Sequence, residues 1–266
     1  MRQTFFFYFA LILARKKDSR VFEIVATKVS DSFILEKFQK DYVLGFYYKV
    51  IGQYESAKDK FETCLNENKH YFRARREIVE VLIALEDFEL ANHLAELNYN
   101  QYPNNIFNIF QHFNCLIREK SVDTNKLLTL LKNAEEISVI TKSSQQFYPE
   151  MKALYKRIID NDPNESIRIL NENSHLFDNK VYFYRELFDS YVKLKKLEQM
   201  EKTFELLKQH VEESPNYLPL LVRRECILYY YKYKDLNKIN LILNQSKVPE
   251  QTKKRILNYI RFWDDK

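Results

Sequence analysis

Hydrophobic residues recur every three to four positions along nearly the whole chain, in stretches separated by short polar segments. This spacing predicts amphipathic α-helices joined by short connections. The expected helices cover residues 4–17, 20–30, 32–51, 54–67, 70–84, 87–101, 104–120, 123–138, 143–160, 163–173, 179–195, 197–212, 216–233, 235–246 and 249–264. Because the connections are short, we expect successive helices to pair as antiparallel hairpins.

Two neighbouring hairpins repeat each other at an offset of 34 residues, since Tyr54 and Ala57 of the first correspond to Phe88 and Ala91 of the second. The first hairpin carries Leu44, Gly45, Tyr48, Gly52, Tyr54, Ala57, Phe61 and Leu65, and the second carries Ile78, Leu82, Phe88, Ala91 and a closing Pro103. This order and spacing resemble the tetratricopeptide repeat, whose unit is a pair of antiparallel helices.

The residue types in this pattern have a packing reason. Two helices approach closely only where one of them carries a small side chain, and Ala57 and Ala91 are such positions. A large side chain such as Phe61 then fills the space that remains. Gly45 and Gly52, the two glycines of the chain, match the positions of a close helix contact and of a turn.

The resemblance implies an all-α fold, a right-handed superhelical solenoid of antiparallel helix pairs with about seven repeats. We predict a single array over residues 1–266. Its expected parts are a partial or degenerate first repeat (1–31), the best-matching repeats (32–120), divergent helical repeats (121–178), and further repeats with a capping helix (179–266). In the last part, Leu187, Tyr191 and Phe204 recover the spacing of Leu44, Tyr48 and Phe61, and the capping helix carries Lys253, Lys254, Arg255 and Trp263.

The amino-acid composition argues against several classes of fold and of functional site. Two glycines and six prolines are too few for the turns of an all-β protein or for a glycine-rich phosphate loop. Cys64, Cys115 and Cys226 lie far apart, and the five histidines show no metal-ligand spacing. We therefore expect reduced thiols in a cytoplasmic protein, with no cofactor, no metal site and no catalytic residue. The pair Arg168 and His175 resembles a helical ribonuclease signature only loosely, and we interpret it as coincidence.

The first helix has an unusual composition. An apolar run from Phe5 to Ala14 lies between Arg2 and the basic residues 15–17. The run is shorter than the about 20 apolar residues that span a bilayer, so we expect no membrane span. We interpret it as a buried helix of a partial repeat, with a secretory leader and a membrane-surface helix as alternatives. The abrupt start is also consistent with a piece of a longer protein.

The resemblance also implies a binding surface, because tetratricopeptide repeats usually hold partners on the concave face made by the first helix of each pair. Carrying those positions over gives a peptide-binding groove of Tyr42, Phe46 and Lys49, then Arg73, Arg76 and Glu80, then Phe110, Asn114 and Arg118. Gln39, Ile83 and Phe107 occupy further positions of the same face. The set differs from the chaperone-tail clamp, because Tyr42 and Phe46 stand where its lysine and asparagine belong.

The predicted groove mixes aromatic and cationic side chains. Arg73 and Arg76 are three residues apart and therefore share one helix face. Such a surface suits an acidic or phosphorylated peptide, because guanidinium groups bind carboxylates and phosphates. In the alternative interpretation the two arginines lie on a solvated face, paired with Glu77 and Glu80.

We interpret the chain as a protein-protein interaction scaffold or adaptor rather than an enzyme, because no cluster of titratable residues is visible. One alternative is a sensor or oligomerisation arm of a larger bacterial regulatory or antiviral-defence protein, with self-association. The other is a nucleic-acid-binding helical repeat protein. Nucleic acid is the less favoured partner, because the net charge is only +5 and the basic clusters would have to merge into one stripe.

Overall fold

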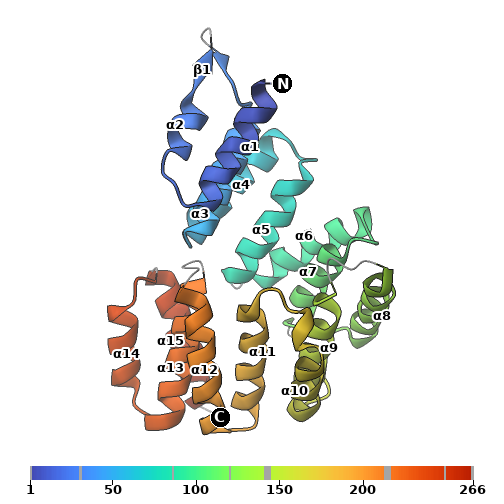
Figure 1. Cartoon of the computed structure of the whole chain (residues 1–266), viewed down its shortest axis with the longest axis vertical. Helices are drawn as coiled ribbons and strands as arrows, with labels where there is room; N and C mark the ends of the chain where they lie inside the picture. The colour runs from blue at the N-terminus through green and yellow to red at the C-terminus, as the bar shows by residue number, and fades with distance from the viewer. Residues whose placement is uncertain are drawn as a thin grey trace. The chain divides into compact units, whose positions relative to one another are not determined.

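The computed structural model describes residues 2–29, 32–85, 87–119, 121–140, 145–212, 217–248 and 250–264. Nearly all of them are helical, and within each of two compact units every helix packs against the next along the chain, as the sequence predicted. The chain divides into two compact units, unit 1 (Met1–Val122) and unit 2 (Asp123–Lys266). Figure 1 shows the helices of each unit. The boundary between them falls between Val122 and Asp123.

Unit 1 contains the hairpins that carry the repeat pattern. Its elements are α1 (Arg2–Arg15), α2 (Val21–Ala26), β1 (Lys28–Val29), β2 (Ser32–Phe33), α3 (Lys37–Val50), α4 (Tyr54–Glu67), α5 (Phe72–Ala84), α6 (Phe88–Gln101) and α7 (Ile106–Leu116). The first helix of each pair also packs on the first helix of the next, α1 on α3, α3 on α5 and α5 on α7. These helices therefore form one layer of the unit.

Unit 2 is also built from consecutive helix pairs. Its elements are α8 (Thr124–Ile140), α9 (Phe147–Ile158), α10 (Pro163–Glu172), the 3-10 turn η2 (Ser174–Leu176), α11 (Lys180–Lys193), α12 (Leu197–Glu212), α13 (Leu218–Tyr233), α14 (Leu236–Gln245) and α15 (Glu250–Asp264). Pro163 follows Asp162, whose side chain accepts a hydrogen bond from the backbone of Glu165, so α10 begins where its N-terminal signals predict. The side chain of Trp263 lies outside the described residues.

The expected helix over 32–51 was wrong at its start. Residues 28–29 and 32–33 form a short antiparallel pair of strands, with Lys28 opposite Phe33, and α3 begins only at Lys37. A capping box explains that start, because the side chain of Gln39 accepts a hydrogen bond from the backbone of Glu36 at 3.1 Å. The cap fixes the first turn of α3, and the preceding residues are left to pair as strands.

The close helix contacts lie where the sequence predicts them. Ala57, Ala91 and Phe61 are fully buried. A Cβ atom at Gly45 would lie 2.9 Å from the ring of Phe61, so only glycine fits that contact without a shift. Gly52 has a φ of 80°, the left-handed conformation that glycine adopts in the turn after α3.

In unit 2, larger side chains occupy the helix contact that corresponds to the one at Gly45 and Ala57. In the pair α11 and α12, Phe188 and Met200 stand where unit 1 has Gly45 and Ala57, and both are fully buried. They belong to a core that continues through α13, α14 and α15. The spacing of Leu187, Tyr191 and Phe204 thus marks a real hairpin, although its seam is filled differently.

Candidate functional site

A hollow of about 600 Å³ lies on the layer formed by α1, α3 and α5 in unit 1. Its lining residues, which we call the α1–α3–α5 groove, are Tyr8, Leu11, Ile12, Arg15, Tyr42, Phe46, Phe72, Arg73, Arg76 and Glu77. Four residues of the sequence-derived groove are therefore brought together here: Tyr42, Phe46, Arg73 and Arg76. Tyr42 is buried at the base, where its ring lies 5.9 Å from that of Phe61.

Lys49 and Glu80 are engaged in an ion-pair cluster beside this groove. The Lys49 ammonium lies 2.5 Å from a carboxylate oxygen of Glu77 and 2.5 Å from one of Glu80. Burial by itself lowers the pKa of Lys49, but the charges of Glu80 and Glu77 outweigh it and raise that pKa. Arg76 joins the cluster at 3.3 Å from Glu77. Arg76 is therefore paired with Glu77, as the alternative interpretation expected. Arg73 is not part of this cluster, and Glu80 is paired with Lys49 instead.

Arg73 and Arg15 are the exposed cations of the groove. Within the described part of the chain, no carboxylate lies in ion-pair distance of either guanidinium. Arg73 instead donates to the Tyr8 hydroxyl at 3.5 Å, and its guanidinium carbon lies 5.9 Å from the centre of that ring. Arg15 lies 5.8 Å from the ring centre of Phe46. Cation–π contacts hold both groups in place without neutralising their charge.

Of the predicted residues of the third repeat, Phe110 and Asn114 lie on α7 and Arg118 lies in the turn after it, and none of them lines the hollow. Asn114 is buried, and its side-chain nitrogen donates to the carbonyl of Phe110 at 3.1 Å. Arg118 donates to the Asn114 side-chain oxygen at 2.9 Å. Phe107, in contrast, is exposed, and the Arg76 guanidinium lies 5.8 Å from its ring centre. This aromatic contact connects α7 to the edge of the groove.

The remaining residues of the predicted face have structural contacts. Gln39 caps α3 and also accepts a hydrogen bond from Gln3 at 3.0 Å, which links it to α1. Ile83 packs against the core of unit 1. Both side chains therefore contribute to packing next to the groove.

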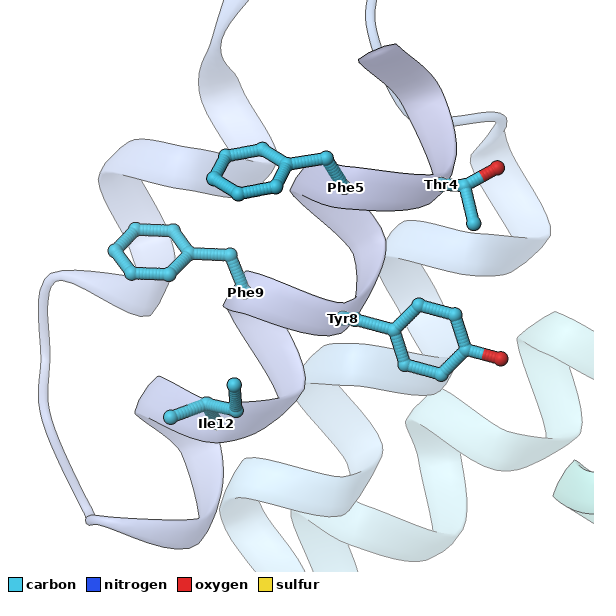
Figure 2. A pocket seen from close by; sticks show the side chains of 5 residues that line it. All are labelled: Thr4, Phe5, Tyr8, Phe9 and Ile12. Carbon is cyan, nitrogen blue, oxygen red and sulfur yellow. The ribbon is translucent and has the colours of Figure 1, made fainter. Parts of the chain in front are cut away.

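The contribution of α1 to the groove was missed. Its sequence is apolar all round, which is typical of a helix buried on every side. Phe7, Ala10, Leu11, Leu13 and Ala14 are indeed buried. The other face is open: Phe5 is 65% exposed, Tyr8 49%, Phe9 39% and Ile12 49%. Figure 2 shows these side chains on that face, with Phe5, Phe9 and Ile12 toward one edge and Tyr8 toward the other. In the sequence, the only indication that α1 contributes to the groove is the lack of polar residues on this exposed face.

Unit 2 carries a buried ionic network that the sequence did not reveal. It joins α9, α11 and α13 through Glu150, Arg157, Arg185, Glu186, Asp189 and Arg224. Arg185 lies 2.7 Å from Glu150 and 2.7 Å from Glu186, and Arg224 lies 2.7 Å from Asp189. Burial lowers the pKa of Arg185, but the charges of Glu186 and Glu150 outweigh it and raise that pKa. Three cations and three carboxylates thus compensate one another inside the unit.

Metal-binding groups and membrane-spanning helices are absent from the described part of the chain. None of its residues form a group of three histidine, cysteine or acidic side chains that could hold a metal ion. None of the helices described is long and apolar enough to cross a membrane. Arg168, the residue of the loose ribonuclease signature, is exposed and lies 2.6 Å from both Glu165 and Glu172.

Comparison with known proteins identifies the fold. No protein-family model and no curated protein sequence matches the chain. Among solved structures, the chain is similar to a tetratricopeptide repeat protein of Parabacteroides merdae, with a TM-score of 0.59, 12% identity, and coverage of 98% of this chain and 99% of that one. It is also similar to TTC0263, a thermophilic tetratricopeptide repeat protein of Thermus thermophilus, with a TM-score of 0.55, 18% identity, and coverage of 72% and 98%. The chain therefore has the fold of the tetratricopeptide repeat proteins.

Proposed function

We propose that the chain is a protein-interaction scaffold that binds an acidic peptide segment of a partner protein in the α1–α3–α5 groove. One observation carries the proposal. Arg15 and Arg73 present guanidinium groups at an aromatic-lined hollow, with no described carboxylate paired to them. Carboxylates or phosphates of a partner would supply the missing negative charge.

The surrounding residues would give the groove its specificity. The rings of Phe46 and Tyr8 would contact apolar side chains of the peptide. Arg15 and Lys49 lie against the Phe46 ring and Arg73 lies against the Tyr8 ring, so positive charge accompanies each of these contacts. The cluster of Lys49, Arg76, Glu77 and Glu80 has two cations and two carboxylates and is already balanced, so its role would be to hold α3 against α5. Phe110 on α7 and Arg118 in the turn after it would extend the same binding face, and the buried Asn114 would hold Arg118 in place through its side-chain oxygen.

We place this activity in the cytoplasm and assign no catalysis to it. Cys64, Cys115 and Cys226 are free, and burial raises the pKa of each thiol to about 12. Such thiols are unreactive and suit a reducing compartment. Among the residues that the structure describes, no contact favours a nucleic-acid partner or an oligomerisation arm over the peptide scaffold.

Affinity purification from host lysate tests this proposal. The full chain is compared with an Arg15→Glu, Arg73→Glu variant, with nuclease present in all samples, and bound proteins are quantified by mass spectrometry. Lys254→Glu, on an exposed position of α15, serves as the charge-reversal control. We expect a partner that the groove variant loses and the control keeps. A partner retained equally by all three chains would contradict the proposal.

A further inference from the structure

The open face of α1 forms an apolar ridge. Phe5, Tyr8, Phe9 and Ile12 follow one another at helical spacing, and with Thr4 they line a shallow hollow of about 460 Å³. The rings of Phe5 and Phe9 stack with centroids 6.0 Å apart, which makes the ridge continuous (Figure 2). At a rise of about 1.5 Å per residue the ridge is roughly 10 Å long. A contiguous exposed apolar surface of this kind is typical of an interaction site rather than of a helix face left to solvent.

The ridge is continuous with the cationic groove. Tyr8 and Ile12 line both hollows, so no polar border separates them. Arg15 follows Ile12 by three residues and stands on the groove side, while Arg73 contacts the hydroxyl of Tyr8. A ligand in the groove would therefore meet apolar contacts along α1 and positive charge beside them.

We propose that the partner segment is an acidic amphipathic helix that packs along α1, with apolar residues on Phe5, Phe9 and Ile12 and carboxylates toward Arg15 and Arg73. This inference rests on the function proposed above and names its partner class. Helices pack by placing the ridges of one into the grooves of the other, and α1 already packs on α3 through its opposite face. A segment with apolar residues at positions i, i+3, i+4 and i+7 matches the ridge in the same way.

Charge favours this occupant over a second copy of the chain. In an antiparallel pair of α1 helices, Arg15 of one copy would face the first turn of the other, where Gln3 and Thr4 carry no charge. The carboxylate beside them, Glu36, already accepts hydrogen bonds from Gln3 at 3.2 Å and from the first turn of α3. A flat membrane is also a poorer match, because Arg73 belongs to a hollow lined by three helices rather than to a protruding face. Both occupants are therefore outcomes that the experiment must separate.

The test uses the full chain and a designed 18-residue fluorescent peptide, with leucines at helical spacing on one face and glutamates on the flanks. Two control peptides keep the length: one has the same composition in an order that gives no apolar face, and one replaces the glutamates with lysines. Binding is measured by fluorescence anisotropy against wild type, Phe5→Ser with Phe9→Ser, Arg15→Glu with Arg73→Glu, and Leu241→Ser. Leu241 is 56% exposed on α14 and is the matched control for loss of an exposed apolar side chain.

We expect the acidic helix to bind wild type at least tenfold more tightly than either control peptide. The Phe5, Phe9 variant and the Arg15, Arg73 variant should each lose about tenfold or more, and Leu241→Ser should bind as wild type does. The inference is overturned if the acidic helix does not bind, or if the control peptide of the same composition without an apolar face binds equally well. It is also overturned if the Phe5, Phe9 variant binds as wild type does.

Further readouts separate this inference from the function on which it rests. If the lysate partner depends on Arg15 and Arg73 but not on Phe5 and Phe9, the acidic groove stands and the helical partner is wrong. If neither pair matters, both proposals fail. Co-sedimentation with phosphatidylserine vesicles that Phe5→Ser with Phe9→Ser abolishes, or a dimer in sedimentation equilibrium that the same variant dissociates, would instead assign the ridge to a membrane or to a second copy.

Discussion

The ammonium group of Lys49 on α3 lies 2.5 Å from the carboxylate of Glu77 on α5, and both side chains are largely shielded from solvent. The contact joins the first helices of two successive repeats, 28 residues apart in the chain. It stabilises the layer that carries the groove, because without it each charge would keep only one, more exposed partner in a poorly hydrated site: Glu80 for Lys49 and Arg76 for Glu77.

We predict that Lys49→Met destabilises unit 1 by about 3 kcal/mol, since it leaves the buried Glu77 with only the more exposed Arg76 as a partner. Urea unfolding followed by circular dichroism measures the change. The double variant Lys49→Met, Glu77→Leu should recover part of the loss, because no buried charge then remains. Additive losses in the double variant would mean that the two groups do not stabilise each other.

The same pair predicts a pH dependence. Burial alone would raise the pKa of Glu77, but the charge and hydrogen bond of Lys49 lower it below its ordinary value. A carboxyl group with a lowered folded-state pKa contributes stability above about pH 4.3, the ordinary value for glutamate, and this contribution is lost as the pH falls through the folded-state pKa. We expect the stability difference between wild type and Glu77→Gln to shrink as the pH is lowered from 7 toward 3. Melting curves that stay parallel over this range would contradict it.

Gly45 offers a prediction about packing. A methyl group there would contact the Phe61 ring at 2.9 Å, and the ring is fully buried, so we expect Gly45→Ala to cost about 1–2 kcal/mol despite the better helix propensity of alanine. Thermal melting checks the sign. Adding Phe61→Leu should reduce the penalty of Gly45→Ala relative to its effect in wild type. A stabilising Gly45→Ala would show that the ring moves freely.

The ionic network of unit 2 should be essential to its stability. Glu186 is 2% exposed and pairs with both Arg157 and Arg185, so we expect Glu186→Gln to cost about 3 kcal/mol or more. Glu165→Gln removes a carboxylate from the exposed pair with Arg168 and is the matched control, for which we expect no measurable change. Chemical unfolding of both variants compares a buried pair with a solvated one. Equal effects would contradict the role assigned to burial.

The sequence by itself determined the helices, because helix formation depends on local periodicity and on local start and stop signals. The structure places α4 at Tyr54–Glu67 and α12 at Leu197–Glu212, the ranges that the hydrophobic pattern predicted. The small-residue contacts at Ala57 and Ala91 were equally readable, since they recur at the repeat period. The start of α3 was missed because the cap formed by Glu36 and Gln39 was not recognised.

Only the tertiary structure decided which charges remain open to a partner. Arg73 and Lys49 looked alike in the sequence, yet Lys49 is neutralised by carboxylates about 30 positions away while Arg73 meets Tyr8, 65 positions away. The exposed ridge of α1 could not be predicted for the same reason. The sequence of a helix that is apolar on all sides does not indicate which face packs against a neighbour and which remains exposed. Helix identity is encoded within a few turns of chain, whereas pairing and exposure depend on which segments the fold brings together.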